Sequence, residues 1–237
     1  MNSSYNPGRV AGSLYLLLGF AVFRLQYIPR ALFVRGNATA TVNNIAAHER
    51  LFRFGMISDL LTATFAIFVV LALYRLLKGV NHDQAVLMVI LGGPMPAAVY
   101  FFNVMNDVAA LLFARPADFV SVFEKPQRGA MVLLFLRLHD YGVFTNEIFW
   151  GLWLIPFGIL VYKSRFLPRI LGVWLILNAL PYLATSFTGF LWPQYADRVW
   201  NNLFPLAFGE AAIMLWLLIK GAKPQPLGDA ASSSGAG

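Results

Sequence analysis

Residues 149–176 read FWGLWLIPFGILVYKSRFLPRILGVWLI. A short basic connection, residues 163–169, separates two apolar runs, and Pro168 stands at the start of the second run. Proline suits the first turn of a helix, because the N–H that it lacks would have no partner there. The stretch therefore predicts two helices joined by a tight hairpin, with Lys163 and Arg165 holding the connection at an anionic membrane surface.

The composition indicates that lipid is the solvent for most of the chain. The 237 residues are 59% hydrophobic and 12% charged, with a mean hydropathy of +0.65, whereas a soluble domain has about 25% charged residues. The absence of cysteine excludes disulfides, thiolate metal sites and cysteine nucleophiles. The formal net charge is +7. The basic residues lie scattered at the ends of apolar runs, so we predict contact with the lipid bilayer and no nucleic-acid binding.

Six segments are long and apolar enough to cross roughly 30 Å of hydrocarbon as helices, in which every backbone polar group is paired. They are residues 10–28, 54–77, 85–113, 143–162, 170–191 and 203–219. The run from residue 129 to residue 162 is too long for one perpendicular span. We therefore predict an all-α fold, a polytopic transmembrane helix bundle of about six spans, with an interfacial or kinked helix before span four.

The domain organisation is expected to be simple. Residues 1–221 form a single transmembrane helical domain, and residues 222–237, which are rich in Pro, Ser, Gly and Ala, form a disordered cytoplasmic tail. The first segment is a retained anchor, since only Arg9 precedes a long apolar run. Lysines in the connections are divided four against one between the two sides. This bias predicts a multi-pass protein of the cell inner (plasma) membrane with both termini in the cytoplasm.

Ionisable side chains inside the predicted spans are the functional candidates, because burying them in a membrane costs free energy. At 100° per residue, Asp140 and Glu147 lie about 20° apart on a helix and Arg137 about 60° from Asp140, whereas His139 points elsewhere. With the termini inside, the polar groups of all six spans fall at mid-depth or in the outer half. The predicted ligand-binding candidates are Arg24, Asp59, Asn103, Asp107, Arg137, Asp140, Glu147, Tyr182 and Glu210.

These depths predict a polar cavity that opens outward. Its core acids are Asp59, Asp107, Glu147 and Glu210, with Arg24 and Arg137 as partial counter-charges. An isolated carboxyl group in a low-dielectric site binds a proton or attracts a cation. The leading hypothesis is therefore binding of a small polar or cationic ligand, for transport or sensing.

Two alternatives remain open at this point. One is a membrane-embedded enzyme acting on a lipid or quinone, with Glu147 and either Asp140 or His139 as acid and base. The other is a structural scaffold or assembly partner, in which every acid would be paired. No metal or cofactor is predicted, because His48, His82 and His139 lie in different segments and no nucleotide-binding, HExxH or GxSxG motif occurs. No catalytic residue is assigned.

Three stretches carry a resemblance to a known family. They are RVAGSLYLLLGF (9–20), the hairpin at 149–176 and EAAIMLWLLIKG (210–221), and the most specific element is Lys-Ser-x-x-Leu-Pro-x-x-Leu-Gly at 163–172. Over nearly its whole length except the tail, the chain resembles the bacterial family catalogued as domain of unknown function 4386. The resemblance implies a prokaryotic multi-spanning inner-membrane protein. It implies no activity and supplies no catalytic residues.

Overall fold

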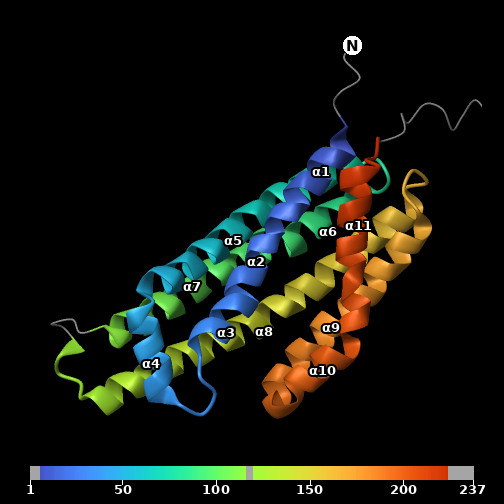
Figure 1. Cartoon of the computed structure of the whole chain (residues 1–237). Coiled ribbons are helices and arrows are strands. Elements are labelled where there is room, and N and C mark those ends of the chain that lie inside the picture. The colour runs from blue at the N-terminus through green and yellow to red at the C-terminus, as the bar shows by residue number, and fades with distance from the viewer. Residues whose placement is uncertain (1–5, 116–119, 224–237) are drawn as a thin grey trace, which may run out of the picture.

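The computed structural model describes residues 6–115 and 120–223, and these residues form helices and connections without a strand (Figure 1). In chain order the elements are α1 (Pro7–Leu16), η1 (Leu17–Gly19), α2 (Phe20–Val22), η2 (Phe23–Tyr27), α3 (Ile28–Leu32), α4 (Ala38–Ala47), α5 (Glu49–Leu77), α6 (His82–Gly92), α7 (Pro94–Ala114), α8 (Lys125–Lys163), α9 (Arg169–Leu191), η4 (Pro193–Tyr195), α10 (Ala196–Leu203), η5 (Phe204–Ala207) and α11 (Phe208–Ile219).

Six helical segments are long and apolar enough to cross a membrane, as predicted. They are Pro7–Leu32, Glu49–Leu77, His82–Ala114, Lys125–Lys163, Arg169–Leu191 and Pro193–Ile219. The all-α polytopic bundle is thus confirmed. Of the predicted tail, residues 222–237, the part from residue 224 onward lies outside the described residues.

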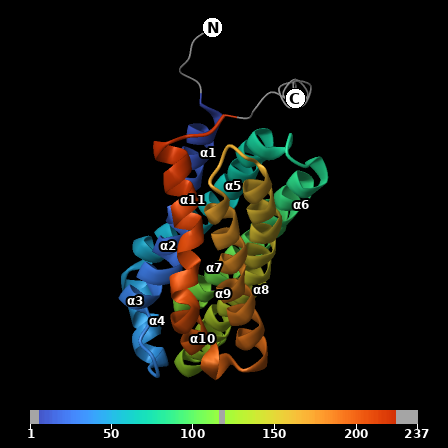
Figure 2. The ribbon, with the colours of Figure 1, turned by 90° about the vertical axis from the view of Figure 1, so that its right-hand side faces the viewer.

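The spans close into a ring in the order in which they occur in the chain. Contacts join α1 to α5, α5 to α7, α7 to α8, α8 to α9, α9 to α11, and α11 back to α1 (Figures 1 and 2). The ends meet at one pole of the bundle, where the Gly8 N–H donates to the Ala222 carbonyl at 3.0 Å. At the same pole, Arg9 Nη2 donates to the Ile219 carbonyl at 3.2 Å. The first and last spans therefore start and finish on the same side of the membrane.

The first and third spans are irregular for local chemical reasons. In the first, a π-helical turn, η2, precedes Pro29. Proline has no N–H to donate and its ring crowds the carbonyl four residues earlier, which a widened turn accommodates. In the third, α6 ends at Gly93, where φ is −115° and ψ is −90°, and Pro94 starts α7. Each break changes the direction in which the following polar residues point.

The fourth span is one unbroken helix. α8 has 39 residues and continues without interruption through Gly142, so at 1.5 Å per residue it is about 58 Å long, far more than the hydrocarbon thickness. Its first turns extend beyond the neighbouring spans and pack against α4 (Figure 1). α4 itself was not predicted, because its ten residues are too few to give a spanning signal. The side chain of Asn37 caps it by accepting from the Ala40 N–H.

The apolar core is divided by a polar layer. One large cluster surrounds Leu154, Phe157 and Leu217 near the pole that holds the termini. A second surrounds Ile28 and Phe52 toward the opposite pole, and a small third cluster holds Ala63, Ala97 and Tyr100. The buried ionisable residues Arg24, Asp59, Asp107 and His139 lie between the two larger clusters, where apolar side chains exclude water.

The hairpin between α8 and α9 depends on close backbone contact at glycine. A Cβ atom added to Gly158 would lie 2.6 Å from the Gly172 carbonyl oxygen and 2.7 Å from Ile176 Cγ1. Small residues of this kind let two membrane helices approach closely enough for strong dispersion contacts. The Lys163–Gly172 element is thus explained by packing as well as by the Pro168 helix start.

We predict that Gly158→Ala lowers the Tm of the detergent-purified protein by at least about 3 °C, because the added methyl forces α8 away from α9. Gly129→Ala is the matched control. It is the same substitution in the same helix, with nothing within 4 Å of the new Cβ, and alanine is the better helix former. Equal Tm values for the two variants would show that the glycine contact does not hold the hairpin together.

Candidate functional site

Four ionisable side chains meet in the polar layer, and we call them the ion cluster: Arg24, Asp59, Asp107 and His139. They come from η2, α5, α7 and α8, so each belongs to a different span. None is more than 2% exposed. A group of charges this deeply buried must be neutralised from within, because water does not reach it.

Arg24 and Asp107 form a two-pronged ion pair. Arg24 Nε donates to Asp107 Oδ2 at 2.7 Å and Nη2 donates to Oδ1 at 2.5 Å. The guanidinium also lies 5.9 Å from the ring centroids of Phe33 and Phe52. This fork-to-carboxylate geometry is the strongest form of ion pair in proteins, and here it fastens the first span to the third.

His139 bridges the two carboxyl groups of the cluster. Its Nε2 lies 3.4 Å from Asp59 Oδ2 and 3.6 Å from Asp107 Oδ2. The second oxygen of Asp59, Oδ1, is buried without a hydrogen-bond partner in the described part of the chain. Asn103 fixes the position of this helical turn, since its Nδ2 donates to the His139 carbonyl at 3.0 Å.

Asp59, Asp107 and His139 each offer one ligand atom within 4.8 Å of the others, which is near enough to consider a metal ion. Arg24 makes a metal ion unfavourable here, because it already engages both oxygens of Asp107. Its fixed positive charge would also repel a divalent ion at this distance. With neutral His139, two carboxylates and one guanidinium leave one negative charge, so the cluster suits a single positive charge.

A second polar group is centred on Glu210 of α11. Tyr15 of α1 donates its hydroxyl to Glu210 Oε1 at 2.7 Å, and Tyr182 of α9 donates to Oε2 at 2.8 Å. The Glu210 N–H donates to Asn178 Oδ1 at 3.2 Å. Within residues 6–115 and 120–223, no basic side chain forms an ion pair with this carboxyl group. Tyrosine donors hold it in place without cancelling its charge.

Glu147 of α8 stands apart from both groups. It is 7% exposed, and its Oε2 is buried without a hydrogen-bond partner among the residues described. The neighbouring Asn146 Oδ1 and, on α9, Asn178 Nδ2 and Thr185 Oγ1 are also unpartnered. Native proteins leave few buried polar atoms in this condition, so a concentration of them on two adjacent helices requires an explanation.

Four aromatic rings lie along the same region, and we call them the aromatic wall: Tyr100, Trp150, Tyr182 and Trp200. Successive ring centroids are 5.9, 5.8 and 5.6 Å apart, from α7 through α8 and α9 to α10. Tyr100 is buried, whereas Trp150, Tyr182 and Trp200 are partly exposed. Tyr100 lies within electrostatic range of both Asp59 and Glu210, so the aromatic wall connects the ion cluster to the Glu210 group.

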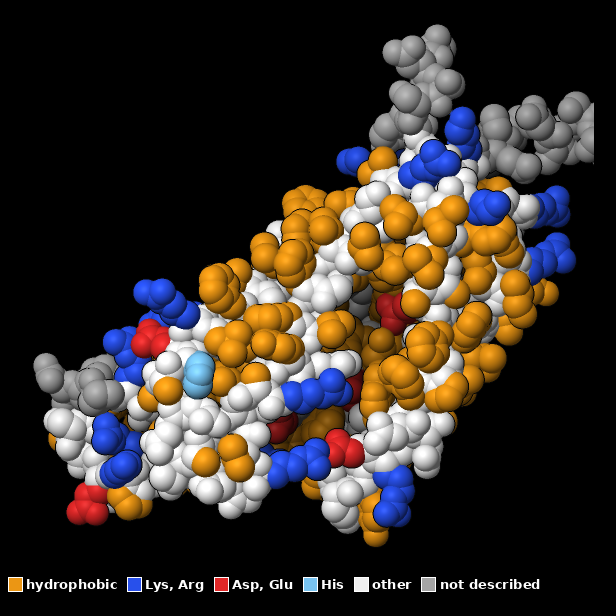
Figure 3. All heavy atoms as spheres, viewed as in Figure 1, with side chains coloured by type: hydrophobic (Ala, Val, Ile, Leu, Met, Phe, Trp, Pro, Cys, Tyr) orange, Lys and Arg blue, Asp and Glu red, His pale blue; other side chains and the backbone are white. Residues whose placement is uncertain are grey.

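The surface above these residues is recessed. Figure 3 shows a hollow that follows α8 between the α2–α3 side and the α9–α11 side, with acidic side chains set back inside it. The hollow widens toward the pole opposite Asn6 and Ala222. There an exposed ion pair, Arg35 Nη2 to Asp197 Oδ2 at 3.2 Å, joins the end of the first span to α10.

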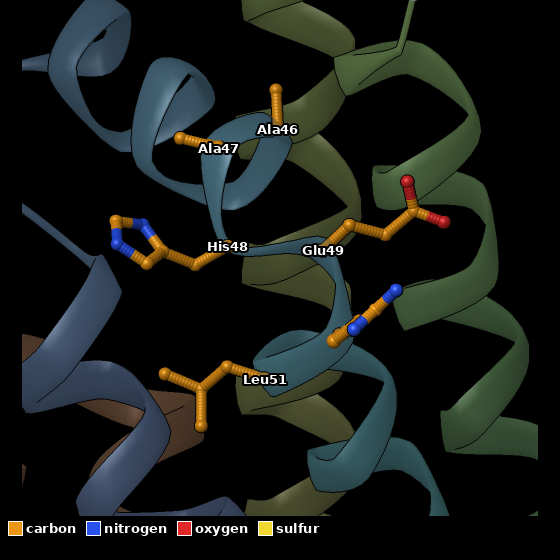
Figure 4. A pocket seen from close by; sticks show the side chains of 6 residues that line it. Ala46, Ala47, His48, Glu49 and Leu51 are labelled. Carbon is orange, nitrogen blue, oxygen red and sulfur yellow. The ribbon is translucent and has the colours of Figure 1, made fainter.

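A separate depression at the junction of α4 and α5 is lined by Ala46, Ala47, His48, Glu49, Arg50 and Leu51. Figure 4 shows the side chains of His48 and Glu49 pointing away from each other. Glu49 is bound instead by Arg53 at 2.7 Å and Arg115 at 3.1 Å. All six lining residues are consecutive, so this depression is the outer surface of a bend and its polar groups do not converge.

The structure distributes the predicted candidates over separate places. Arg24, Asp59, Asn103 and Asp107 gather around His139, while Tyr182 joins Glu210. Arg137 and Asp140 lie outside these groups, with side chains 78% and 56% exposed and 4.0 Å between Nη1 and Oδ2. No hydrogen bond or ion pair of the described residues joins Glu147 to Asp140 or His139, the partners proposed for an enzyme.

Three residues of these groups, His139, Tyr15 and Asn178, were not among the predicted candidates. His139 was placed off the acidic face of its helix, but it belongs to a buried stripe of α8 with Val132, Leu136 and Asn146. That stripe has helical spacing and was visible in the sequence. Tyr15 gave no signal, because a tyrosine near a helix end is typical of a membrane interface.

The fold and these buried polar groups define a multi-spanning membrane protein with a charged interior. More particularly, the chain belongs to the family described as Domain of unknown function (DUF4386), which matches residues 10–221. The resemblance noted in the sequence is thereby confirmed. A relative from Archaeoglobus fulgidus, described as an uncharacterized protein, is 28% identical over 144 residues, which is 58% of this chain and 81% of the relative. No solved structure matches the chain significantly.

The pair between Arg24 and Asp107 gives a direct prediction. Arg24→Gln leaves Asp107 buried without its counter-charge, which should cost about 3–5 kcal/mol of unfolding free energy. Adding Asp107→Asn to the same chain removes the uncompensated charge and should recover more than half of the loss. Reversible unfolding in mixed detergent micelles measures the unfolding free energy of wild type, of the two single variants and of the double variant. Additive losses in the double variant would mean that the two side chains do not interact.

Proposed function

We propose that this protein binds a small organic cation beside Glu147, Glu210 and the aromatic wall, and that binding serves transport or sensing. The observation that carries the proposal is Glu147: a carboxyl group that is 7% exposed, with a buried oxygen lacking any partner in the described chain. An unpaired buried carboxyl group costs several kcal/mol. A cationic ligand would recover that free energy, which no residue of the described chain does.

The aromatic wall supports an organic cation rather than a small inorganic one. Faces of Trp and Tyr rings attract alkylammonium groups, which have little water to lose, and each such contact contributes about 0.5–2 kcal/mol. Trp150 is three residues from Glu147 on α8, and Tyr182 of α9 donates to Glu210 of α11, so each acid lies near a ring of the aromatic wall. Glu210 adds a second negative charge, and hydrogen bonds from Tyr15 and Tyr182 hold its carboxyl group in place.

The position of the hollow supports access from one side of the membrane. It widens at the pole opposite Asn6 and Ala222 (Figure 3). Lysine bias in the connections favours both termini in the cytoplasm. With that orientation the hollow faces outward, toward ligands outside the cell.

The test is a thermal-shift comparison of tetraethylammonium with a neutral molecule of similar shape, 3-ethyl-3-pentanol. The hydrocarbon of identical shape, 3,3-diethylpentane, is too insoluble in water to use. The cation should raise the Tm of wild type by about 2 °C or more at saturation, since binding only the folded state stabilises it. Glu147→Gln should abolish the shift. Trp150→Leu should weaken binding by about 2–30-fold, from the lost cation–π contact.

Asp140→Asn is the matched control. It removes a carboxyl group from the same helix, two turns from Glu147, but at a largely exposed position. This variant should respond to the cation as wild type does. A Glu147→Gln protein that keeps the full shift, or an equal shift from the neutral alcohol, would refute cation binding at this place.

A further inference from the structure

The ion cluster is a second, independent place where the protein requires a positive charge. Arg24 contributes one positive charge, and Asp59 and Asp107 contribute two negative charges when ionised. His139 is the fourth member and decides the balance, because it is neutral or carries one positive charge. The cluster is electrically neutral only when it holds one additional proton.

The geometry restricts what can supply this charge. The four side chains are at most 2% exposed, and His139 Nε2 lies 3.4 Å from Asp59 Oδ2, which is within hydrogen-bond distance. Arg24 already engages both oxygens of Asp107. Asp59 Oδ1 is buried without a hydrogen-bond partner among the described residues. A proton shared by His139 and Asp59 supplies the missing charge without placing a metal ion beside the guanidinium of Arg24.

The charged and titratable groups that face this pair come from η2, α7 and α8. Arg24 faces it from η2, and Asp107 and Tyr100 face it from α7. Asp140 follows His139 directly in α8 and interacts electrostatically with both His139 and Arg24. Of these groups, His139 is the one whose ordinary titration falls within the physiological range.

We propose that Asp59 and His139 bind one exchangeable proton between them and that the contact of these two side chains, which joins α5 to α8, depends on it. With the proton present, His139 donates to Asp59 and all charges in the cluster cancel. Without it, a net negative charge remains in the polar layer and pushes the two carboxyl groups apart. The proton is thus a ligand of the membrane interior, bound independently of any organic cation at Glu147.

The test uses the fact that the chain has three histidines, His48, His82 and His139. The full-length protein with 15N-labelled histidine is placed in lipid nanodiscs, and imidazole nitrogen shifts are recorded between about pH 5 and 9. His139 is assigned by the signal that disappears in His139→Gln. We expect it to gain or lose one proton in a single transition within this range.

Asp59→Asn should displace the midpoint of the His139 transition by at least about one pH unit, since the carboxylate partner is gone. Glu210→Gln, which removes a carboxyl group from the other polar group, should displace it far less. The Tm of wild type should fall as the pH rises through the transition, because the folded state then loses the proton that balances its charge. That fall should be absent in His139→Gln.

Two results would overturn the proposal: a His139 signal that is constant over the whole range, or one whose midpoint is unchanged by Asp59→Asn. A response of the same signal to sodium or zinc ions at fixed pH would also overturn it, in favour of a metal ion. If Asp59→Asn does not fold, infrared difference spectra of wild type across the transition decide the matter. A carboxyl or carboxylate band must then change together with the imidazole band.

Discussion

The contact on which the rest of the molecule depends is the ion pair of Arg24 with Asp107. Two short hydrogen bonds join the first span to the third in a region that water does not reach. Because Asp107 is held in this way, Asp59 and His139 come together beside it from α5 and α8. Four of the six spans are therefore fixed by one set of charges, and their relative rotation is set by electrostatics as much as by apolar packing.

The ring of spans separates two kinds of polar chemistry. On one side, charges cancel within the ion cluster except for a single unit. On the other, Glu210 is held by tyrosine hydroxyls, and Glu147, beside rings that are partly exposed, has a buried oxygen without a partner in the described part of the chain. Tyr100 lies close to both sides. Each side therefore offers its own place for a positive charge, and Tyr100 is the residue that both sides share.

Sequence reasoning predicted the spans well, because a run of about 20 apolar residues has few alternatives in lipid. The hairpin at Pro168 was equally readable. Sequence reasoning did not predict which acids come together. Helical periodicity shows the face on which a residue lies, but not which neighbouring helix that face contacts. Asp59 and Glu147 are both acids within apolar segments, yet Asp59 meets His139, whereas Glu147 has no hydrogen-bond partner among the described residues. The fixed order of spans around the ring, which the sequence does not encode locally, makes that difference.

The widened turn η2 sets the rotation of the first span at Arg24. A π turn holds one residue more than an α turn, so the residues that follow it are rotated relative to a continuous α-helix. Arg24 lies within this turn, and its guanidinium meets Asp107. The place of one extra residue in the first span therefore decides whether Arg24 faces the polar layer.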